Sequence, residues 1–156
     1  MAVGFEQGFP PASPAEIDRV ESQLGVELPG DYRAFLQRQN GGDLEENFLP
    51  PEADASARYL YSAGPNDDDD IDDLVSAATF YSPDSPADPE IDPDYLPIGE
   101  DDGGNVVCLK VRGDDRGAVY FWAHDAFEGT DPFERLADSF DDFFEALRPI
   151  EEMDLD

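Results

Sequence analysis

The 156 residues of this chain are the size of one ordinary domain, and 40% of them are hydrophobic, which suffices for a core. Thirty-nine acidic residues face nine basic ones, so the formal net charge is −30 at pH 7. Such a charge repels the phosphates of nucleic acids and of anionic membranes; we expect neither as a partner and expect a basic protein instead. Adaptation to a salty cytoplasm, where repulsion is screened, is an alternative cause of the overall acidity.

Sequence features also bear on the cellular compartment. Cys108 is the only cysteine, which excludes an intramolecular disulfide and a cysteine metal site. Residues 1–6 lack the basic start and apolar run of a signal peptide, and no segment approaches the ~18 apolar residues of a membrane-spanning helix. We therefore expect a cytoplasmic protein with a single domain, residues 1–156.

Two short helices are predicted near the N-terminus. Residues 13–16, Ser-Pro-Ala-Glu, combine a helix cap, a first-turn proline and a capping box, and apolar residues then recur at helical spacing up to Gly25. A second helix with an aromatic stripe follows Pro29, and we expect Asn40, Gly41 and Gly42 to end it, because both residue types tolerate the left-handed conformation. Neither helix can bury its apolar face alone, so both must pack on another element.

Strands are predicted from residue 58 onwards. Residues 58–61 are expected to form the first strand, and residues 106–111 and 118–122 a hairpin. Residues 96–99 precede the hairpin and are expected to be a short edge strand, because Pro97 cannot donate a hydrogen bond to a neighbouring strand.

A helix with a strongly apolar face is predicted near the C-terminus. Its stripe consists of Phe140, Phe143, Phe144 and Leu147. The helix can begin one turn earlier, at Leu136, or at a cap formed by Ser139 with Asp142, in which case residues 133–138 are extended. Pro149 marks its end.

No catalytic, metal or cofactor site is predicted. His124 is the only histidine and precedes an aspartate, but no positioned nucleophile accompanies it, so a turn role is favoured. The acidic run at residues 67–73 lacks the central glycine of a calcium loop, and the acidic residues before Gly103 would repel a phosphate. We therefore expect a protein that is not an enzyme.

The acidic clusters are the candidate partner-binding residues. The densest comprises Asp67, Asp68, Asp69, Asp70, Asp72 and Asp73, and a second turn carries Glu100, Asp101 and Asp102. The first run can be a solvated loop that caps a short helix at residues 71–81, or a surface that binds a basic protein. Tyr81, Tyr95 and Phe127 lie beside acidic loops and are candidate apolar anchors for such a partner.

Four segments carry a family resemblance. They are residues 17–42 (IDRVESQLGVELPGDYRAFLQRQNGG), 95–111 (YLPIGEDDGGNVVCLKV), 117–125 (GAVYFWAHD) and 136–147 (LADSFDDFFEAL). In this order they resemble the SUKH superfamily, which includes the fungal cell-wall-assembly regulator domain and many bacterial immunity proteins. The resemblance implies an α+β fold in which a mostly antiparallel sheet is flanked by an N-terminal helix pair and a C-terminal helix.

The resemblance also implies a non-enzymatic role. Many bacterial members look like immunity proteins encoded beside polymorphic toxins, often nucleases, which they bind and neutralise. We therefore expect an immunity protein that neutralises a cognate toxin through an acidic surface. A regulatory protein-interaction module of the cell-wall-assembly or signalling type is the alternative.

Overall fold

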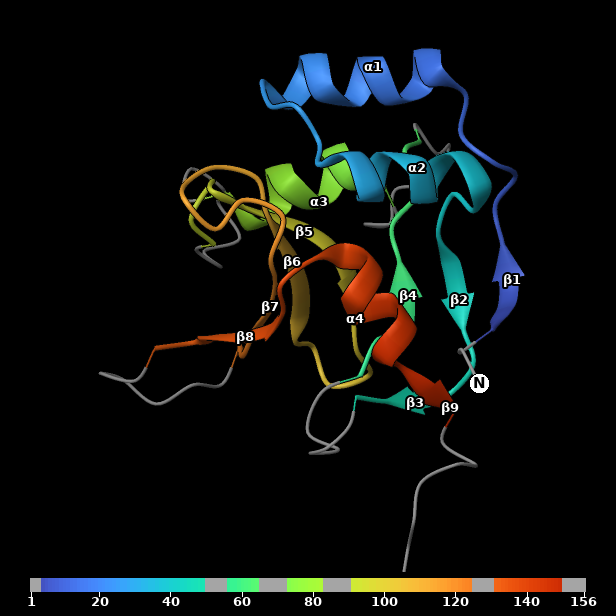
Figure 1. Cartoon of the computed structure of the whole chain (residues 1–156), viewed down its shortest axis with the longest axis vertical. Helices are drawn as coiled ribbons and strands as arrows, with labels where there is room; N and C mark the ends of the chain where they lie inside the picture. The colour runs from blue at the N-terminus through green and yellow to red at the C-terminus, as the bar shows by residue number, and fades with distance from the viewer. Residues whose placement is uncertain (1–3, 50–55, 65–72, 83–90, 125–130, 150–156) are drawn as a thin grey trace, which may run out of the picture.

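A seven-stranded antiparallel sheet is the centre of the molecule. The computed structural model describes residues 4–49, 56–64, 73–82, 91–124 and 131–149 (Figure 1). The strands in sheet order are β1 (Phe5–Gly8), β2 (Gly42–Leu44), β4 (Tyr59–Leu60), β5 (Tyr95–Glu100), β6 (Val106–Lys110), β7 (Val119–Trp122) and β8 (Phe133–Ala137). A separate antiparallel pair joins β3 (Asn47–Phe48) to β9 (Arg148–Pro149). With the four helices found in the described residues, this is an α+β fold, as predicted.

The helices pack around a common core with one face of the sheet. They are α1 (Pro14–Leu24), α2 (Gly30–Arg38), α3 (Leu74–Tyr81) and α4 (Phe140–Ala146). In Figure 1, α1 to α3 gather over the upper ends of the strands and α4 lies in front of the sheet. We call the sheet face that meets this core the inner face and the opposite one the outer face.

The predicted helix caps are present. Ser13 and Glu16 form the capping box of α1, and Gly25 ends that helix with a φ of 70°. The side chain of Ser139 accepts a hydrogen bond from the backbone N–H of Asp142. Of the two predicted starts of the C-terminal helix, the later one is therefore the correct one, and the residues before it form β8.

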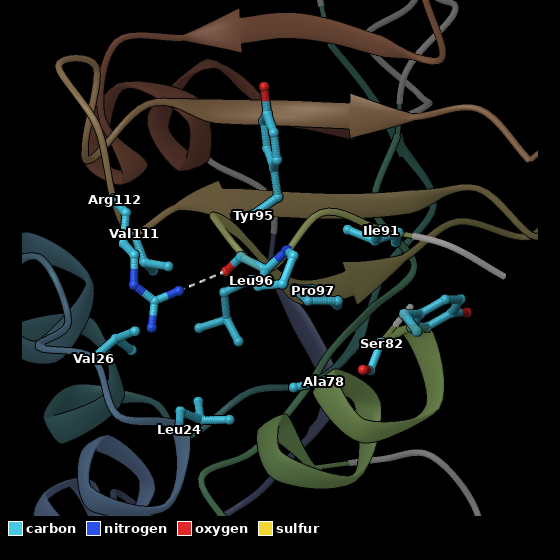
Figure 2. A pocket seen from close by; sticks show the side chains of 12 residues that line it. Leu24, Val26, Ala78, Ser82, Ile91, Tyr95, Leu96, Pro97, Val111 and Arg112 are labelled. Carbon is cyan, nitrogen blue, oxygen red and sulfur yellow. Dashed lines mark hydrogen bonds between the residues drawn. The ribbon is translucent and has the colours of Figure 1, made fainter. Parts of the chain in front are cut away.

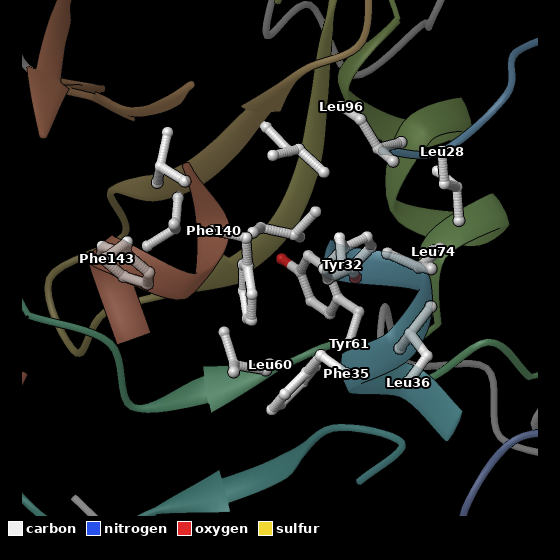
Figure 3. Close-up of a cluster of buried hydrophobic side chains, with 14 of the residues drawn as sticks. Leu28, Tyr32, Phe35, Leu36, Leu60, Tyr61, Leu74, Leu96, Phe140 and Phe143 are labelled. Carbon is white, nitrogen blue, oxygen red and sulfur yellow. The ribbon is translucent and has the colours of Figure 1, made fainter. Parts of the chain in front are cut away.

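Aromatic contacts bind α2 to α4. The ring of Phe140 lies 4.7 Å from that of Phe35 and 5.0 Å from that of Tyr32, and all three side chains are buried (Figure 3). Each such pair adds about 0.5–1.5 kcal/mol beyond the burial of its area. The aromatic stripe of the second helix therefore docks the C-terminal helix.

The expected glycine stop of α2 is wrong. The helix ends at Arg38, and its cap residue Gln39 is extended, with a φ of −146°. Gly41 and Gly42 instead lead into β2, where Gly41 has a φ of 76°. A Cβ on Gly41 would lie 2.4 Å from the carbonyl oxygen of Leu60, so glycine is needed for the close approach of β2 to β4.

Two strand predictions also need correction. Residues 59–60 form the fourth strand of the chain rather than the first, because β1, β2 and β3 precede them. β5 is a central strand rather than an edge, since it pairs with both β4 and β6. Pro97 is tolerated because it lies beyond the end of β4 and at the register shift between Pro97 and Gly99.

The close approach at Gly41 can be tested by mutation. We expect Gly41→Ala to lower the free energy of unfolding by about 2–5 kcal/mol, which sums the left-handed strain of alanine and a clash with β4. Gly25→Ala is the matched control: its φ is 70°, but its added Cβ would meet no atom within 4 Å. This control should lose only about 1–2 kcal/mol. Urea unfolding followed by Trp122 fluorescence measures both variants, and equal losses would contradict the explanation.

Candidate partner-binding surface

Strands β5 to β7 carry apolar residues on both faces. The inner face carries Leu96, Val107, Leu109, Val119 and Phe121, which join the core under the helices. The outer face carries the buried residues Val106 and Cys108 and four half-buried aromatic residues, Tyr95, Tyr120, Trp122 and Phe133. We call these four residues the aromatic platform. In the described part of the chain they cover the outer face of β6 together with Ile91 and with Tyr81 of α3.

The platform is held by ring contacts between distant strands. Tyr95 of β5 stacks on Phe133 of β8 with ring centroids 4.0 Å apart, and Tyr95 meets Tyr120 edge-on at 5.0 Å. The rings therefore reach over β6 and β7; in Figure 2, Tyr95 extends across the neighbouring strands. Cys108, which belongs to this cluster, is fully buried, and burial raises the pKa of its thiol. It is thus an inert packing residue.

The basic side chains on the platform are paired with carboxylates. The ammonium of Lys110 lies 4.2 Å from the Tyr95 ring centroid and 3.5 Å from a carboxylate oxygen of Asp115. Asp115 also accepts a hydrogen bond from the Tyr120 hydroxyl and lies 4.0 Å from Arg135. The hydrogen bond from Tyr120 is the main cause that lowers the pKa of Asp115; a backbone hydrogen bond and the charge of Lys110 also lower it, while burial opposes the shift.

Glu100 borders the platform and lacks such a counter-charge. It faces the same side as Trp122, because Glu100 pairs with Val106 and Val106 pairs with Trp122 across three strands. Its Oε2 accepts a hydrogen bond from the Tyr61 hydroxyl at 3.0 Å. Burial raises the pKa of Glu100, and Asp101 adds to the rise while the Tyr61 hydrogen bond opposes it. No basic side chain among the described residues forms an ion pair with Glu100.

The other acidic candidates lie in different environments. Asp67 to Asp70 and Asp72 lie outside the described residues, as does Phe127. Asp73 is buried and caps α3, because its carboxylate accepts from the backbone N–H and the hydroxyl of Ser76. Its carboxylate is therefore engaged inside the protein, in the capping role considered for the acidic run.

Within the second acidic turn, only part of the charge is free. Asp101 stabilises the turn by accepting hydrogen bonds from the backbone N–H groups of Gly103 and Asn105. Asp102 is exposed and lies 3.7 Å from Nε of Arg58. Glu100 and Asp102 are thus only two residues apart, but only Glu100 contacts an aromatic side chain, through its hydrogen bond with Tyr61.

A small apolar pocket adjoins the platform beside β5. Its volume is about 160 Å³, and its lining includes Leu24, Val26, Ala78, Ile91, Leu96 and Val111 (Figure 2). Tyr81 and Tyr95 also line it. Arg112 bridges it by donating to the carbonyl oxygens of Pro93 at 3.1 Å and Gly25 at 3.4 Å. Sequence reasoning missed this pocket, because its walls come from three separate parts of the chain.

No arrangement typical of catalysis or metal binding occurs in the described ranges. His124 is exposed, and its Nδ1 lies 2.9 Å from Oδ1 of Asn105, a turn residue. Residues 4–49, 56–64, 73–82, 91–124 and 131–149 contain no group of three or more His, Cys, Asp or Glu side chains that could hold a metal ion. Within the same residues, no helix has the length and apolarity needed to cross a membrane.

Glu100 gives a testable dependence of stability on pH. Burial raises the pKa of Glu100 in the folded state above its ordinary value, so ionisation of Glu100 lowers the free energy of unfolding. This loss of stability is absent below the ordinary glutamate pKa and is complete once the pH has risen through the folded-state pKa. We expect Glu100→Gln to unfold at a higher urea concentration than the wild type at neutral pH. The advantage should shrink as the pH falls below the ordinary value of 4.5.

Glu134→Gln is the control, since Glu134 is exposed and its substitution removes one negative charge from the same sheet without changing a half-buried carboxylate. Its own effect subtracts the general relief of self-repulsion in an acidic chain. A Glu100→Gln protein that is less stable than Glu134→Gln at neutral pH would contradict the assigned environment of Glu100.

Comparison with known proteins places the chain in a family. A model of the SMI1 / KNR4 family (SUKH-1) matches residues 11–146. The SPbeta prophage-derived uncharacterized protein YokK of Bacillus subtilis (strain 168) is 27% identical over 154 residues, covering 87% of this chain and 76% of YokK. The uncharacterized protein YnaB of the same organism is 50% identical over 34 residues, covering 22% of this chain and 24% of YnaB. The resemblance carried by the four sequence segments is confirmed, and the chain belongs to the SMI1/KNR4 (SUKH-1) family.

Proposed function

We propose that this protein is a non-enzymatic immunity protein that binds a cognate toxin domain in the cytoplasm and neutralises it. The observation that carries the proposal is the half-buried aromatic platform bordered by Glu100, in a family member with a net charge of −30. The description of the relative YokK as prophage-derived supports the proposal, because the immunity proteins that this sequence resembles are encoded beside toxin genes.

The platform has the properties of an interface centre. Tyrosine and tryptophan are enriched among the residues that contribute most to protein–protein binding. The stack of Tyr95 on Phe133 and the edge contact of Tyr81 with Trp122 hold these rings in place before any partner arrives. Pre-ordered rings lose little side-chain entropy on binding, so more of the contact energy remains as affinity.

The charge of the chain selects the class of partner. A toxin that cleaves nucleic acid needs a basic cleft for phosphates, and an acidic inhibitor can match that charge. Complementary fields can raise association rates toward about 10⁸–10⁹ M⁻¹s⁻¹ at low salt, whereas exposed charge pairs add only about 0–1 kcal/mol each. The acidic surface would therefore supply rate and selectivity, and the platform would supply affinity.

A regulatory module of the cell-wall-assembly type is the second candidate. The family match itself favours it, since the matching model is that of SMI1/KNR4. The same surface would then bind a regulatory partner instead of a toxin. A toxin gene beside the gene for this protein favours immunity, and its absence favours regulation.

Growth rescue tests the proposal. Co-expression with the adjacent gene product should restore growth that this product alone arrests, and the two proteins should co-purify. The association rate constant should fall at least about tenfold between about 50 mM and about 500 mM salt, because added salt screens the steering field. A neighbouring product that neither arrests growth nor binds would contradict the immunity role.

Local charge can be separated from total charge by matched variants. Replacing Asp67 to Asp70 by asparagine should slow association with the toxin, because these residues form the densest acidic run. The control replaces four exposed carboxylates on β2 and α4 by amides, namely those of Asp43, Asp141, Asp142 and Glu145. Equal slowing in both variants would mean that only net charge matters and that the acidic run is not a contact surface.

A further inference from the structure

Glu100 has neither a basic neighbour nor a hydrogen bond from a backbone N–H to its carboxylate among the described residues. Other partly buried carboxylates also lack a basic neighbour, but they accept a hydrogen bond from at least one backbone N–H, as do Asp31, Glu45 and Asp101. Glu21 has a side chain 17% exposed and lies 2.5 Å from Nη1 of Arg33. Asp115 has a side chain 26% exposed and has both Lys110 and Arg135 as basic neighbours. A carboxylate removed from water is normally compensated by a nearby cation. Glu100 has no such neighbour among the described residues, although it too is half-buried.

The nearby arginine is directed at other carboxylates, although its buried Nε and Nη1 atoms donate no hydrogen bond among the described residues. Arg58 precedes the strand residue Tyr59 that pairs with Glu100, yet its guanidinium lies 3.7 Å from Glu46 and 3.7 Å from Asp102. The effects that shift the pKa of Glu100 are burial, Tyr61 and Asp101, and none of them comes from a cation. The missing counter-charge therefore has no evident source within the described chain.

Aromatic residues neighbour Glu100 in the sheet. Glu100 pairs with Tyr59 on one side and with Val106 on the other, and Val106 pairs with Trp122, so one valine separates Glu100 from Trp122 along this cross-strand row. The ring of Tyr81 lies 6.1 Å from that of Trp122 at an angle of 65°. Tyr61 donates its hydroxyl to Oε2, which fixes the carboxylate.

We propose that Glu100 is the acceptor for an arginine side chain of the protein partner, whose guanidinium lies against Trp122 and Tyr81. This inference rests on the proposed function, and it names the group that the platform recognises. Oε1 accepts no hydrogen bond from any described residue, and Oε2 keeps one lone pair beside the Tyr61 hydroxyl. A guanidinium can donate to both oxygens and can stack on aromatic rings, whereas an ammonium is a compact and strongly hydrated charge.

The free protein carries a cost that such a partner would remove. Burial of the ionised carboxylate disfavours it in the absence of a counter-charge. An arriving arginine would supply that charge. Glu100 would then lower the stability of the free protein and contribute to binding. Such a trade of stability for function is common at functional sites.

A peptide titration tests the site without any knowledge of the toxin. Trp122 is the only tryptophan, so its fluorescence and its indole N–H resonance report on this position alone. The probe is acetyl-Gly-Arg-Gly-amide, titrated into the full chain and compared with acetyl-Gly-Lys-Gly-amide. We expect a saturable change at Trp122 with the arginine peptide, weaker binding of the lysine peptide, and loss of saturation in Glu100→Gln.

Asp102→Asn is the matched control, since it removes an equal charge from the exposed neighbour in the same turn. It should keep the arginine response within about fivefold of the wild type, as expected for an exposed charge. Glutamine at position 100 retains an acceptor for the Tyr61 hydroxyl, and near-ultraviolet circular dichroism checks that the fold is retained. No saturable response in the wild type, or an equal response in Glu100→Gln, would overturn the proposal.

Measurement of toxin binding provides a second test of the role of Glu100. The dissociation constant for the toxin should rise by about 30-fold or more in Glu100→Gln, because a partner charge would be left desolvated and unpaired, but by less than about fivefold in Asp102→Asn. Equal binding to the wild type and Glu100→Gln would overturn the role of Glu100 while leaving the immunity function standing. A neighbouring gene product that does not bind at all would refute the immunity function, and the peptide titration would still decide whether Glu100 accepts arginine.

Discussion

The burial of β6 on both faces is the constraint on which the rest of the structure depends. Val106, Val107, Cys108 and Leu109 are all fully buried. Helices cover the inner face, whereas aromatic rings from β5, β7 and β8, together with Tyr81 at the end of α3, cover the outer face in the described chain. A ring can bury the strand beneath it and still present an edge at the surface, so the groups that complete the sheet also form a surface that a partner can contact.

The few basic residues of the chain are used to hold it together. Arg33 forms ion pairs with Asp18 and Glu21. Arg112 and Arg116, in the loop between β6 and β7, donate hydrogen bonds to carbonyl oxygens in the link between α1 and α2, namely those of Gly25 and Glu27. Because nine basic residues face thirty-nine acidic ones, most of the acidic charge remains uncompensated. That excess lowers stability through self-repulsion, and a core rich in phenylalanine and tyrosine offsets it.

Local signals in the sequence predicted local structure, and contacts between distant residues decided the rest. Ser13 with Glu16 and the hairpin of β6 and β7 could be located because caps and alternation act over a few residues. Gly41 was assigned to a helix end because its contact with Leu60 is invisible in the sequence. Glu100 could be chosen as an acidic candidate, but its hydrogen bond to Tyr61 and its place in the row with Trp122 depend on sheet order and register.

Oxidative footprinting of side chains, with and without the bound partner, tests the central claim that the outer face of the sheet is the recognition surface. The account predicts that binding protects the platform residues Tyr95, Tyr120, Trp122 and Phe133, together with Tyr81, from oxidation. The reactivity of Phe144, which packs on the core from the helical side, should not change. Protection confined to α1, α2 and α4, with an unchanged Trp122, would contradict it.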